Sequence, residues 1–399
     1  MKIIDLRATP VTVPAEAPWR WSMGVETGTT RTIIELITDE GIVGVGETYG
    51  GAGTVRALEV ARPLVVGLDP LETGLLQHRL GVFTIGYETG VPASVRGGLE
   101  MAALDAAGKA LGRPVASLLG GAVRERVPVA SYLFYRYPSS DGRLAAVDGP
   151  ERILERAIEL KERNGHGVHK LKGGVFPPLE EYAALKLLRE RFPDDPLTWD
   201  PNAAWSVETT IRTGRRLAAD GFDLMFLEDP CQWLEGMSQA RAALQIPFAT
   251  NMCVIGTDQL APGIRLRSID VILADVHYWG GFRGNQKMAA VAEAFGLGVG
   301  MHSDRELGIS TAAMVHLACS MPNLSYAIDS HYHDQSDDVI TRPWEYRNGA
   351  FELPTGPGLG VEVDRDKLDF YHRYYLSHPE VNEYYDPNRP GWVPALPIF

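Results

Sequence analysis

Cysteine is scarce in this chain, and the scarcity limits the chemistry available to the protein. The 399 residues include three cysteines, Cys231, Cys253 and Cys319, which are widely spaced and form no C-x-x-C pair. An odd, scattered set of this kind argues against a disulfide framework and against a zinc site. We therefore expect a protein of a reducing compartment, the cytoplasm.

Long apolar runs and an excess of positive charge are also missing. No stretch of about 18 apolar residues could cross a bilayer, and Asp5 and Pro10 interrupt the N-terminus before the apolar core of a signal peptide could form. The formal net charge is -13, and the lysines and arginines are scattered. These features predict neither a membrane nor nucleic acid as a partner, and an anionic substrate would need a local cation.

What is present is the composition of an ordinary globular protein, with 45% hydrophobic and 22% charged residues. A chain of 399 residues exceeds the size of a single core, which favours one large barrel plus a smaller domain. Residues 31–47 hold two β-branched runs around Asp39-Glu40-Gly41, a β-hairpin signal. Apolar residues then recur at helical spacing over 94–119, so the chain opens with an α+β unit.

After about residue 125, short apolar runs alternate with amphipathic helical segments, which is typical of repeated βα units around a parallel sheet. Eight strands are predicted, over 127–135, 168–172, 197–200, 224–228, 246–250, 270–275, 297–302 and 324–329. Eight such units in succession predict a (β/α) barrel.

Polar residues stand at the carboxyl ends of these strands, where the catalytic groups of such barrels lie. Asp200, Glu228 and Asn251 follow three consecutive strands and offer hard oxygen ligands, which suit Mg²⁺ better than zinc. Each of them alone would more often be a helix cap or a turn residue, which is the alternative interpretation.

Lys170 and Lys172 lie one residue apart on the same side of one predicted strand. Two ammonium groups that close lower each other's pKa, so that one can be a neutral amine near pH 7 and act as a base. A solvated lysine pair at a strand end is the alternative for this spacing taken alone.

His302 follows another strand and would face the same mouth from the side opposite Lys172. Asp275, at the end of the preceding strand, could accept the second imidazole N–H, fix the tautomer and raise the basicity of the ring. A buried histidine satisfied by a neighbour is the alternative, and His277, His316 and His333 are interpreted in that way.

Two bases on opposite faces with a hard metal between them match one chemical problem, the removal of a weakly acidic proton next to a carboxylate. The metal would hold the carboxylate and stabilise the charge that develops on it.

The chain resembles the mandelate racemase branch of the enolase superfamily and, within it, the glucarate dehydratase group. The motifs that carry the resemblance are HKLKGG at His169, WDPNAAW at Trp199, LEDPC at Leu227, ATNM at Ala249, ADVHYW at Ala274, MHSDRELGIS at Met301 and AIDSH at Ala327. The resemblance implies an α/β fold: an N-terminal α+β capping domain with lid loops (1–125), a TIM-like (β/α)7β barrel with the active site (126–365), and a C-terminal segment (366–399) that packs back on the cap.

The resemblance also implies roles for individual residues. Mg²⁺ would be bound by Asp200, Glu228 and Asn251; Lys172, tuned by Lys170, would be one base, and His302 with Asp275 the other. Substrate would be contacted by Tyr132, Phe134, Asn202 and His331, together with Lys170. For Tyr132 and Phe134 a place in the core is the alternative, since large aromatic residues are common there.

The chain departs from the group at the positions that contact the distal end of the substrate. Asp304 stands where the group has asparagine, Arg20 and Val25 replace an asparagine and a histidine of the lid loop, and Gly97 takes the place of a threonine. We expect Asp304 to contact a substrate hydroxyl or to pair with Arg305 or Arg20. Arg20 is predicted either to bind a second substrate carboxylate or to be a surface residue.

The sequence therefore predicts a Mg²⁺-dependent lyase that dehydrates a sugar acid to a 2-keto-3-deoxy acid, with a small-molecule carboxylate as its ligand. A racemase or epimerase with the same two bases is the alternative within enzymes, and a non-catalytic acid-binding relative is the alternative outside them. The resemblance also suggests a homo-oligomer.

Overall fold

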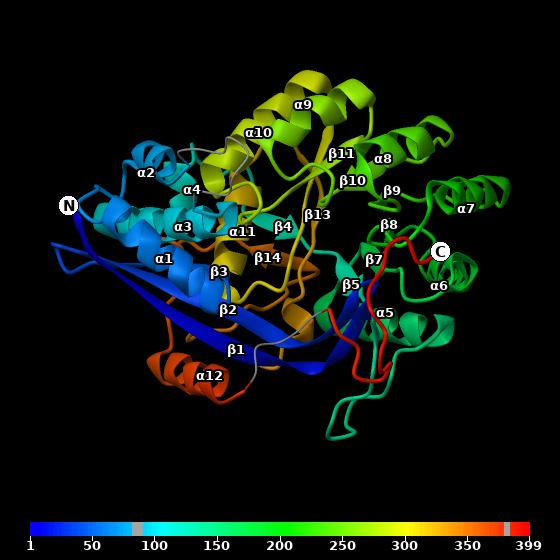
Figure 1. Ribbon diagram of the computed structural model, residues 1–399, viewed down its shortest axis with the longest axis horizontal. Helices are drawn as coiled ribbons and strands as arrows, with labels where there is room; N and C mark the ends of the chain where they lie inside the picture. Colours follow the sequence, from blue (N-terminus) through cyan, green and yellow to red (C-terminus); the bar gives the residue numbers. More distant parts are fainter. Residues whose placement is uncertain (82–90, 379–383) are drawn as a thin grey trace.

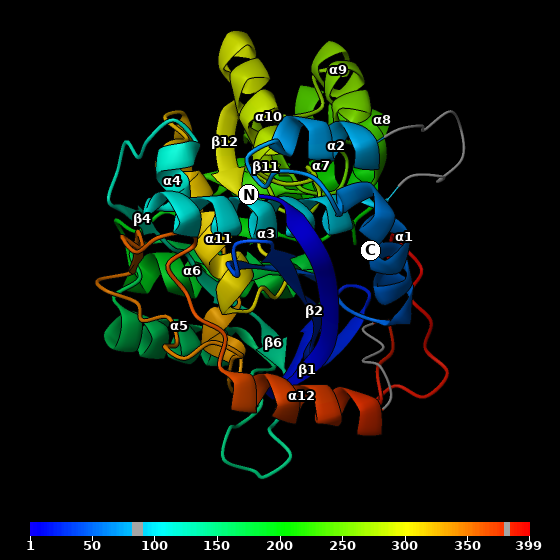
Figure 2. The same ribbon diagram turned by 90° about the vertical axis from the view of Figure 1, so that its left-hand side faces the viewer.

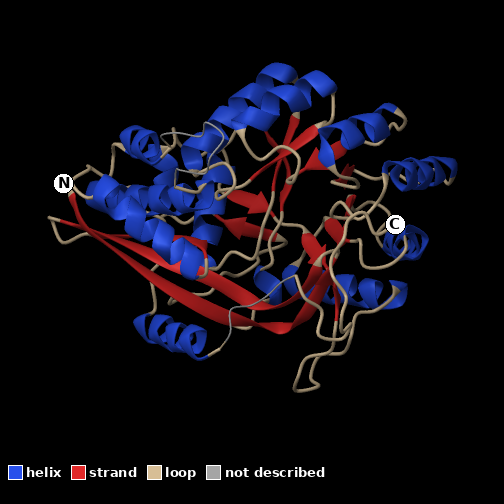
Figure 3. Cartoon of the chain, in the orientation of Figure 1, coloured by secondary structure: helices blue, strands red, loops and turns tan. Residues whose placement is uncertain are grey.

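The computed structural model describes residues 1–81, 91–378 and 384–399. Its centre is a parallel sheet of eight strands in the order β13-β12-β11-β10-β9-β8-β7-β5 (Figures 1 and 3). The strands are β5 (Ser131–Leu133), β7 (His169–Lys172), β8 (Leu197–Asp200), β9 (Phe226–Glu228), β10 (Phe248–Thr250), β11 (Val271–Ala274), β12 (Gly298–Met301) and β13 (Leu324–Ile328). A parallel bridge between Val129 and Ile328 joins the two ends of the sheet.

Seven helices connect these strands, so the predicted (β/α)7β barrel is confirmed. They are α5 (Pro150–Asn164), α6 (Pro178–Arg191), α7 (Val207–Ala219), α8 (Trp233–Ala242), α9 (Thr257–Leu266), α10 (Phe282–Phe295) and α11 (Gly308–Ser320). Helix α11 is buried along almost its whole length, because elements of the N-terminal unit pack on its outer face.

That N-terminal unit is an antiparallel sheet covered by helices (Figure 2). Strands β1 (Ile3–Trp21), β2 (Gly24–Thr38) and β3 (Val43–Tyr49) form the sheet, and α1 (Ala52–Val65), α2 (Thr73–Leu80), α3 (Ala93–Leu111) and α4 (Val115–Leu118) follow. The hairpin predicted around Asp39 is the β2–β3 turn. Helix α3 lies so close to β3 that a Cβ at Gly44 would be 2.0 Å from the carbonyl oxygen of Ala102.

The strand predicted over 127–135 is wrong as a single element. It is divided into β4 (Arg126–Pro128), which pairs with β14 (Ala350–Glu352), the barrel strand β5, and β6 (Tyr135–Arg136), which pairs with β1. A continuous apolar run does not reveal that its backbone hydrogen bonds are made to strands of three different sheets. The division matters because β6 holds the end of β1 over the barrel.

The C-terminal segment has two parts. Helix α12 (Arg365–Ser377) lies against β1, where Arg365 pairs with Glu35 and His372 Nδ1 is 2.7 Å from the carbonyl oxygen of Pro10. Residues 384–399 instead run to the barrel, and the backbone N–H of Ser206 donates to the carbonyl oxygen of Phe399. The domain boundaries at 125 and 365 stay a prediction.

All three cysteines are free thiols. None of the helices within the described ranges combines the length and apolar character needed to cross a membrane.

Candidate active site

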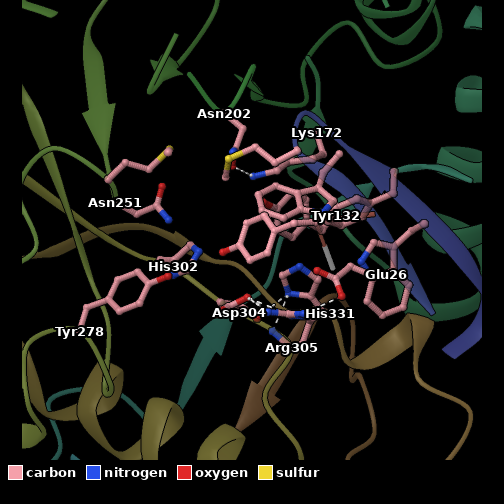
Figure 4. A pocket seen from close by; sticks show the side chains of 17 residues that line it. Glu26, Tyr132, Lys172, Asn202, Asn251, Tyr278, His302, Asp304, Arg305 and His331 are labelled. Atoms are coloured by element: carbon pink, nitrogen blue, oxygen red, sulfur yellow. Dashed lines mark hydrogen bonds and ion pairs between the residues drawn. The ribbon is translucent and has the colours of Figure 1, made fainter. Parts of the chain in front are cut away.

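A cavity of about 140 Å³ lies between the carboxyl ends of the barrel strands and the β1–β2 end of the N-terminal sheet. Eight residues predicted for the site line it: Tyr132, Phe134, Lys172, Asn202, Asn251, His302, Asp304 and His331. Figure 4 shows Lys172 and Asn202 on one side, Asn251 and His302 on another, and Asp304 with His331 on a third. The structure therefore brings residues of six barrel strands or their following loops to one space.

Asp200 and Glu228 are completely buried directly behind the cavity wall, and Asn251 is exposed to it. None of the three is a helix cap, because the helices that follow have Ser206, Gln232 and Gly256 at their N-cap positions. The cap interpretation is therefore excluded for all three.

The contacts of the Asn251 amide bear on whether Asp200, Glu228 and Asn251 could bind a cation. The amide oxygen faces Glu228 Oε1 at 3.3 Å and Asp229 Oδ2 at 2.9 Å, and its nitrogen faces His302 Nε2 at 2.8 Å; turning the amide over would replace these contacts by hydrogen bonds. What fits the set to a hard cation is its chemistry, since Asp200, Glu228 and Asn251 supply two carboxylates and an amide oxygen. Within the described ranges no cluster of three or more His, Cys, Asp and Glu side chains suits a metal, so a site here depends on this amide.

The two lysines of β7 both contact this acidic set. Lys170 Nζ donates to Glu228 Oε2 at 2.7 Å and to Asp329 Oδ2 at 2.6 Å, and Lys172 Nζ donates to Asp200 Oδ2 at 2.6 Å. Burial alone would lower the pKa of Lys170, but the charges of Asp329 and Glu228 raise it well above its usual value. Lys170 is thus held as a cation, the form expected of the residue that tunes Lys172, and the mutual lowering of the two lysine pKa values stays a prediction.

His302 and Asp275 form the predicted pair. His302 Nδ1 lies 2.7 Å from Asp275 Oδ2, while Asp275 Oδ1 accepts the backbone N–H groups of His277 and Tyr278 at 2.6 and 2.8 Å. The carboxylate is thereby held in place, and it holds the imidazole with Nε2 toward Asn251. Burial lowers the pKa of His302, yet the hydrogen bond and charge of Asp275 leave it raised overall.

Tyr132 and Phe134 are buried and also lie at the cavity, and their contact with substrate stays a prediction. The Tyr132 hydroxyl donates to Asp200 Oδ2 at 3.2 Å, and its ring packs against Phe134 and His331 with centroid distances of 4.5 and 4.8 Å.

Arg20 is not among the residues that the structure brings into the cavity. Its guanidinium lies over the rings of Tyr137 and Phe176, 4.9 and 5.1 Å from their centroids. Val25 is a buried residue of β2, whereas the adjacent Glu26 lines the cavity. The expected contact of Arg20 with a distal carboxylate therefore has no geometric support.

The structure shows what surrounds Asp304 and Gly97, the other two positions at which the chain departs from the group. Asp304 pairs with Arg305, one of the two partners expected for it, through Oδ1 at 3.0 Å. At Gly97 a Cβ would lie 2.3 Å from the carbonyl oxygen of Val276, so this backbone has no room for the threonine of the group.

The loops that leave these strands are conformationally unusual. Asn202, Ala203, Asp229 and Arg305 have φ angles of 53°, 59°, 37° and 64°, in the left-handed region that costs free energy for residues other than glycine. They follow Asp200, Glu228 and His302 closely. Such strain is typical of functional sites that the surrounding structure holds in place.

His316 and His333 match their interpretation as buried and satisfied, since they are bonded to the backbone of Ala116 and of Tyr132. His277 is also buried, but only its Nε2 has a partner, Ser310, and its Nδ1 has none within the described ranges. The sequence did not predict the lining residues Trp19, Trp21, Met23, Glu26, Met252, Tyr278, Ser303, Arg305 and Tyr384. Arg305 and Ser303 belong to a quoted motif, but no local pattern shows that the β1–β2 turn or Tyr384 reaches the barrel mouth.

Two family models match the chain. Residues 3–120 match the mandelate racemase / muconate lactonizing enzyme N-terminal domain, and residues 152–367 match the enolase C-terminal domain-like family. A probable glucarate dehydratase of Streptomyces coelicolor is 42% identical over 409 residues, covering 94% of this chain and 92% of its own length.

Solved structures agree with this assignment. An enolase of Mycobacterium smegmatis, complexed with tartrate, has a TM-score of 0.92 at 38% identity and covers 100% of this chain and 98% of its own. An enolase of Thermobispora bispora, complexed with magnesium and formate, has a TM-score of 0.90 at 40% identity, with 96% of each chain covered. The protein belongs to the mandelate racemase branch of the enolase superfamily and, within it, to the glucarate dehydratase-like group.

Proposed function

We propose that this protein is a magnesium-dependent dehydratase of a sugar acid. The observation that carries the proposal is one cavity lined by Lys172, Asn251 and His302, with His302 oriented by Asp275 and with Asp200 and Glu228 buried nearby. The likeness to a probable glucarate dehydratase supports the same reaction class.

Asp200, Glu228 and Asn251 would hold the metal. Their hard oxygen donors suit Mg²⁺, which the solved relative from Thermobispora bispora also contains. Bound there, Mg²⁺ would hold the substrate carboxylate and stabilise the negative charge that develops when the α-proton leaves.

The chain's own groups would move the protons. Lys172 or His302 takes the α-proton, depending on the configuration of the substrate at that carbon. The β-hydroxyl then leaves as water after receiving a proton from an acid of the site, and the resulting enol tautomerises to the 2-keto-3-deoxy acid. Lys170, held as a cation by Glu228 and Asp329, keeps positive charge beside the carboxylate end of the substrate.

A racemase or epimerase is the second candidate, because two proton-transfer groups that reach one cavity also suffice to invert a carbon. Deuterium from solvent appearing at the α-carbon without a keto-acid product would favour it. A non-catalytic acid-binding protein would show neither exchange nor product, and Lys172→Ala would leave its binding unchanged.

The test is to incubate the protein with Mg²⁺ and a panel of aldonic and aldaric acids and to trap 2-keto acids with semicarbazide. We expect a product with at least one acid, loss of activity with a chelator, and a fall of at least about hundredfold in Lys172→Ala, His302→Asn or both, according to the configuration of the acid. Lys367→Ala, which removes a lysine paired with Asp337 outside the cavity, is the matched control and should retain activity. Silence of the folded, magnesium-loaded protein across the panel would contradict the proposal.

A homo-oligomer in the cytoplasm remains part of the proposal. Light scattering coupled to size-exclusion chromatography would test the oligomer directly.

A further inference from the structure

The side of the cavity away from Lys172 is built of charged residues that the proposed proton transfers do not use. We define the distal wall as Glu26, Asp304, Arg305 and His331, all of which line the cavity (Figure 4). Glu26 comes from β2 of the N-terminal sheet, and the other three come from the loops after β12 and β13. The wall therefore joins the N-terminal unit to the barrel.

One guanidinium serves two carboxylates in this wall. Arg305 Nη1 is 2.6 Å from Glu26 Oε2, and Arg305 Nε and Nη2 are both 3.0 Å from Asp304 Oδ1. Glu26 and Arg305 are largely buried, with side chains 5% and 16% exposed. Because two negative charges face one positive charge, the wall is acidic.

Burial lowers the pKa of Arg31, the nearest additional cation, but the charges of Glu47, Glu306 and Asp304 together raise it, so this cation is shared among three carboxylates. Arg31 is 1% exposed and lies behind the loop, where its guanidinium donates to the backbone oxygens of Asp304 and Arg305. Its charge faces Glu47, with Nε 3.5 Å from Oε1. Arg31 thus holds the loop in place without lining the cavity.

His331 completes the wall as a neutral hydrogen-bonding group. Its Nδ1 lies 3.3 Å from the backbone nitrogen of Arg305 and 2.8 Å from the Ser303 hydroxyl, which itself donates to Glu306 Oε2. Asp304 meets Arg305 through Oδ1, and its side chain is 23% exposed at the cavity. The wall therefore offers an imidazole, which donates or accepts according to its tautomer, and an ionised acceptor, and a hydroxyl group can pair with both.

We propose that the distal wall binds the uncharged, hydroxylated end of a monocarboxylate sugar acid and disfavours acids with a carboxylate at both ends. This inference rests on the proposed function for the proximal carboxylate. A second carboxylate would meet Asp304 and Glu26 at close range, and to bind it Arg305 would have to weaken its contacts with these two carboxylates. A terminal CH₂OH group instead donates to Asp304 and lies beside the His331 imidazole, and it brings no second negative charge.

The test compares acids that differ only at the far end, D-gluconate against D-glucarate and D-galactonate against D-galactarate. Binding is measured by titration calorimetry with Mg²⁺ in the Lys172→Ala background, where turnover does not interfere, and kcat/KM is measured separately for the wild type. We expect the monoacid of at least one pair to bind about tenfold or more tightly than its diacid.

Asp304→Asn should reduce or reverse that preference by about tenfold, because it removes the charge that a second carboxylate would meet. Glu26→Gln provides a second variant with the same expected direction. Asp337→Asn is the matched control, since it removes one acid that pairs with Lys367 and Tyr371 outside the cavity, and it should leave the ratio unchanged.

Tighter binding of the diacids by the unaltered wall, equal binding, or binding of neither acid in both pairs would overturn the inference. So would a preference that persists in both Asp304→Asn and Glu26→Gln. If monoacids bind preferentially but the wild type forms no keto acid, the proposed dehydration fails while the assignment of the distal wall stands.

Discussion

Arg31→Met is the substitution whose effect follows most directly from the buried contacts of the fold. Arg31 extends from the N-terminal sheet and donates to the carbonyl oxygens of Asp304 and Arg305 while facing Glu47. Glu47 in turn accepts the backbone N–H groups of Leu307 and Ser310 at the start of α11, each at 2.9 Å. The Arg31–Glu47 ion pair therefore fixes both ends of the loop that follows His302.

Removing the arginine leaves Glu47 buried without its cation. The loss of one partner from a buried ion pair costs about 3–5 kcal/mol when the other group stays ionised. The hydrogen bonds lost at the two carbonyl oxygens account for about 1–2 kcal/mol of this amount.

The size of the loss should depend on pH. Burial raises the pKa of Glu47 from 4.5 to about 7 even though Arg31 lowers it. Because the folded state holds the proton more tightly than the unfolded state, ionising Glu47 costs stability as the pH rises from about 4.5 through 7, by about 3 kcal/mol in total. Without Arg31 the pKa rises further, so the stability of the variant continues to fall at a pH where that of the wild type has levelled off.

Urea unfolding of wild type and Arg31→Met at pH 5.5 and pH 8.5 measures this difference. We expect a deficit of about 1–2 kcal/mol at pH 5.5, where folded Glu47 is protonated in both proteins, and about 3–5 kcal/mol at pH 8.5. Arg31→Met/Glu47→Gln should lose most of the pH dependence. A deficit of equal size at both pH values would refute the reasoning.

Three further substitutions have definite expectations. Asp275→Asn should lower kcat by at least about hundredfold with little change in stability, because His302 loses the group that fixes its tautomer; activity and unfolding measured on the same preparation check this. Glu181→Gln should lower the free energy of unfolding measured in urea by about 2–5 kcal/mol. The Glu181 carboxylate accepts three consecutive backbone N–H groups after β7 and a tryptophan Nε1–H, and the amide nitrogen of glutamine cannot accept them. A loss below about 0.5 kcal/mol would contradict this expectation. Gly97→Ala should lower the melting temperature by several degrees, about 4 or more, because its Cβ would meet the Val276 carbonyl oxygen, whereas Gly53→Ala, with open space around it, should not.

The barrel and the proximal site could be predicted because their signals are local. Each barrel strand is a short apolar run followed by a polar residue, and the parallel topology then brings those strand ends together. Lys172, Asn251 and His302 meet in one cavity for this reason, although they lie far apart in the sequence.

The distal side could not be predicted because it depends on how separate units pack. Arg20 has the charge expected for a distal carboxylate, yet the β1–β6 pairing directs it onto Tyr137 and Phe176. Glu26 has no distinguishing sequence pattern, but its strand carries it over the barrel to Arg305. The raised pKa of Lys170 likewise depends on Asp329, which is 159 residues away in sequence.

The central claim is that Lys172 and His302 transfer protons at the α-carbon of a bound acid. Proton NMR in D₂O, with Mg²⁺ and the acids of the panel, measures deuterium incorporation at that carbon directly. We predict exchange or elimination by the wild type, and a loss of at least about hundredfold in Lys172→Ala, His302→Asn or both, according to the configuration of the acid. A wild-type protein that binds these acids without exchanging the α-proton, or two variants that exchange it at the wild-type rate, would contradict the account.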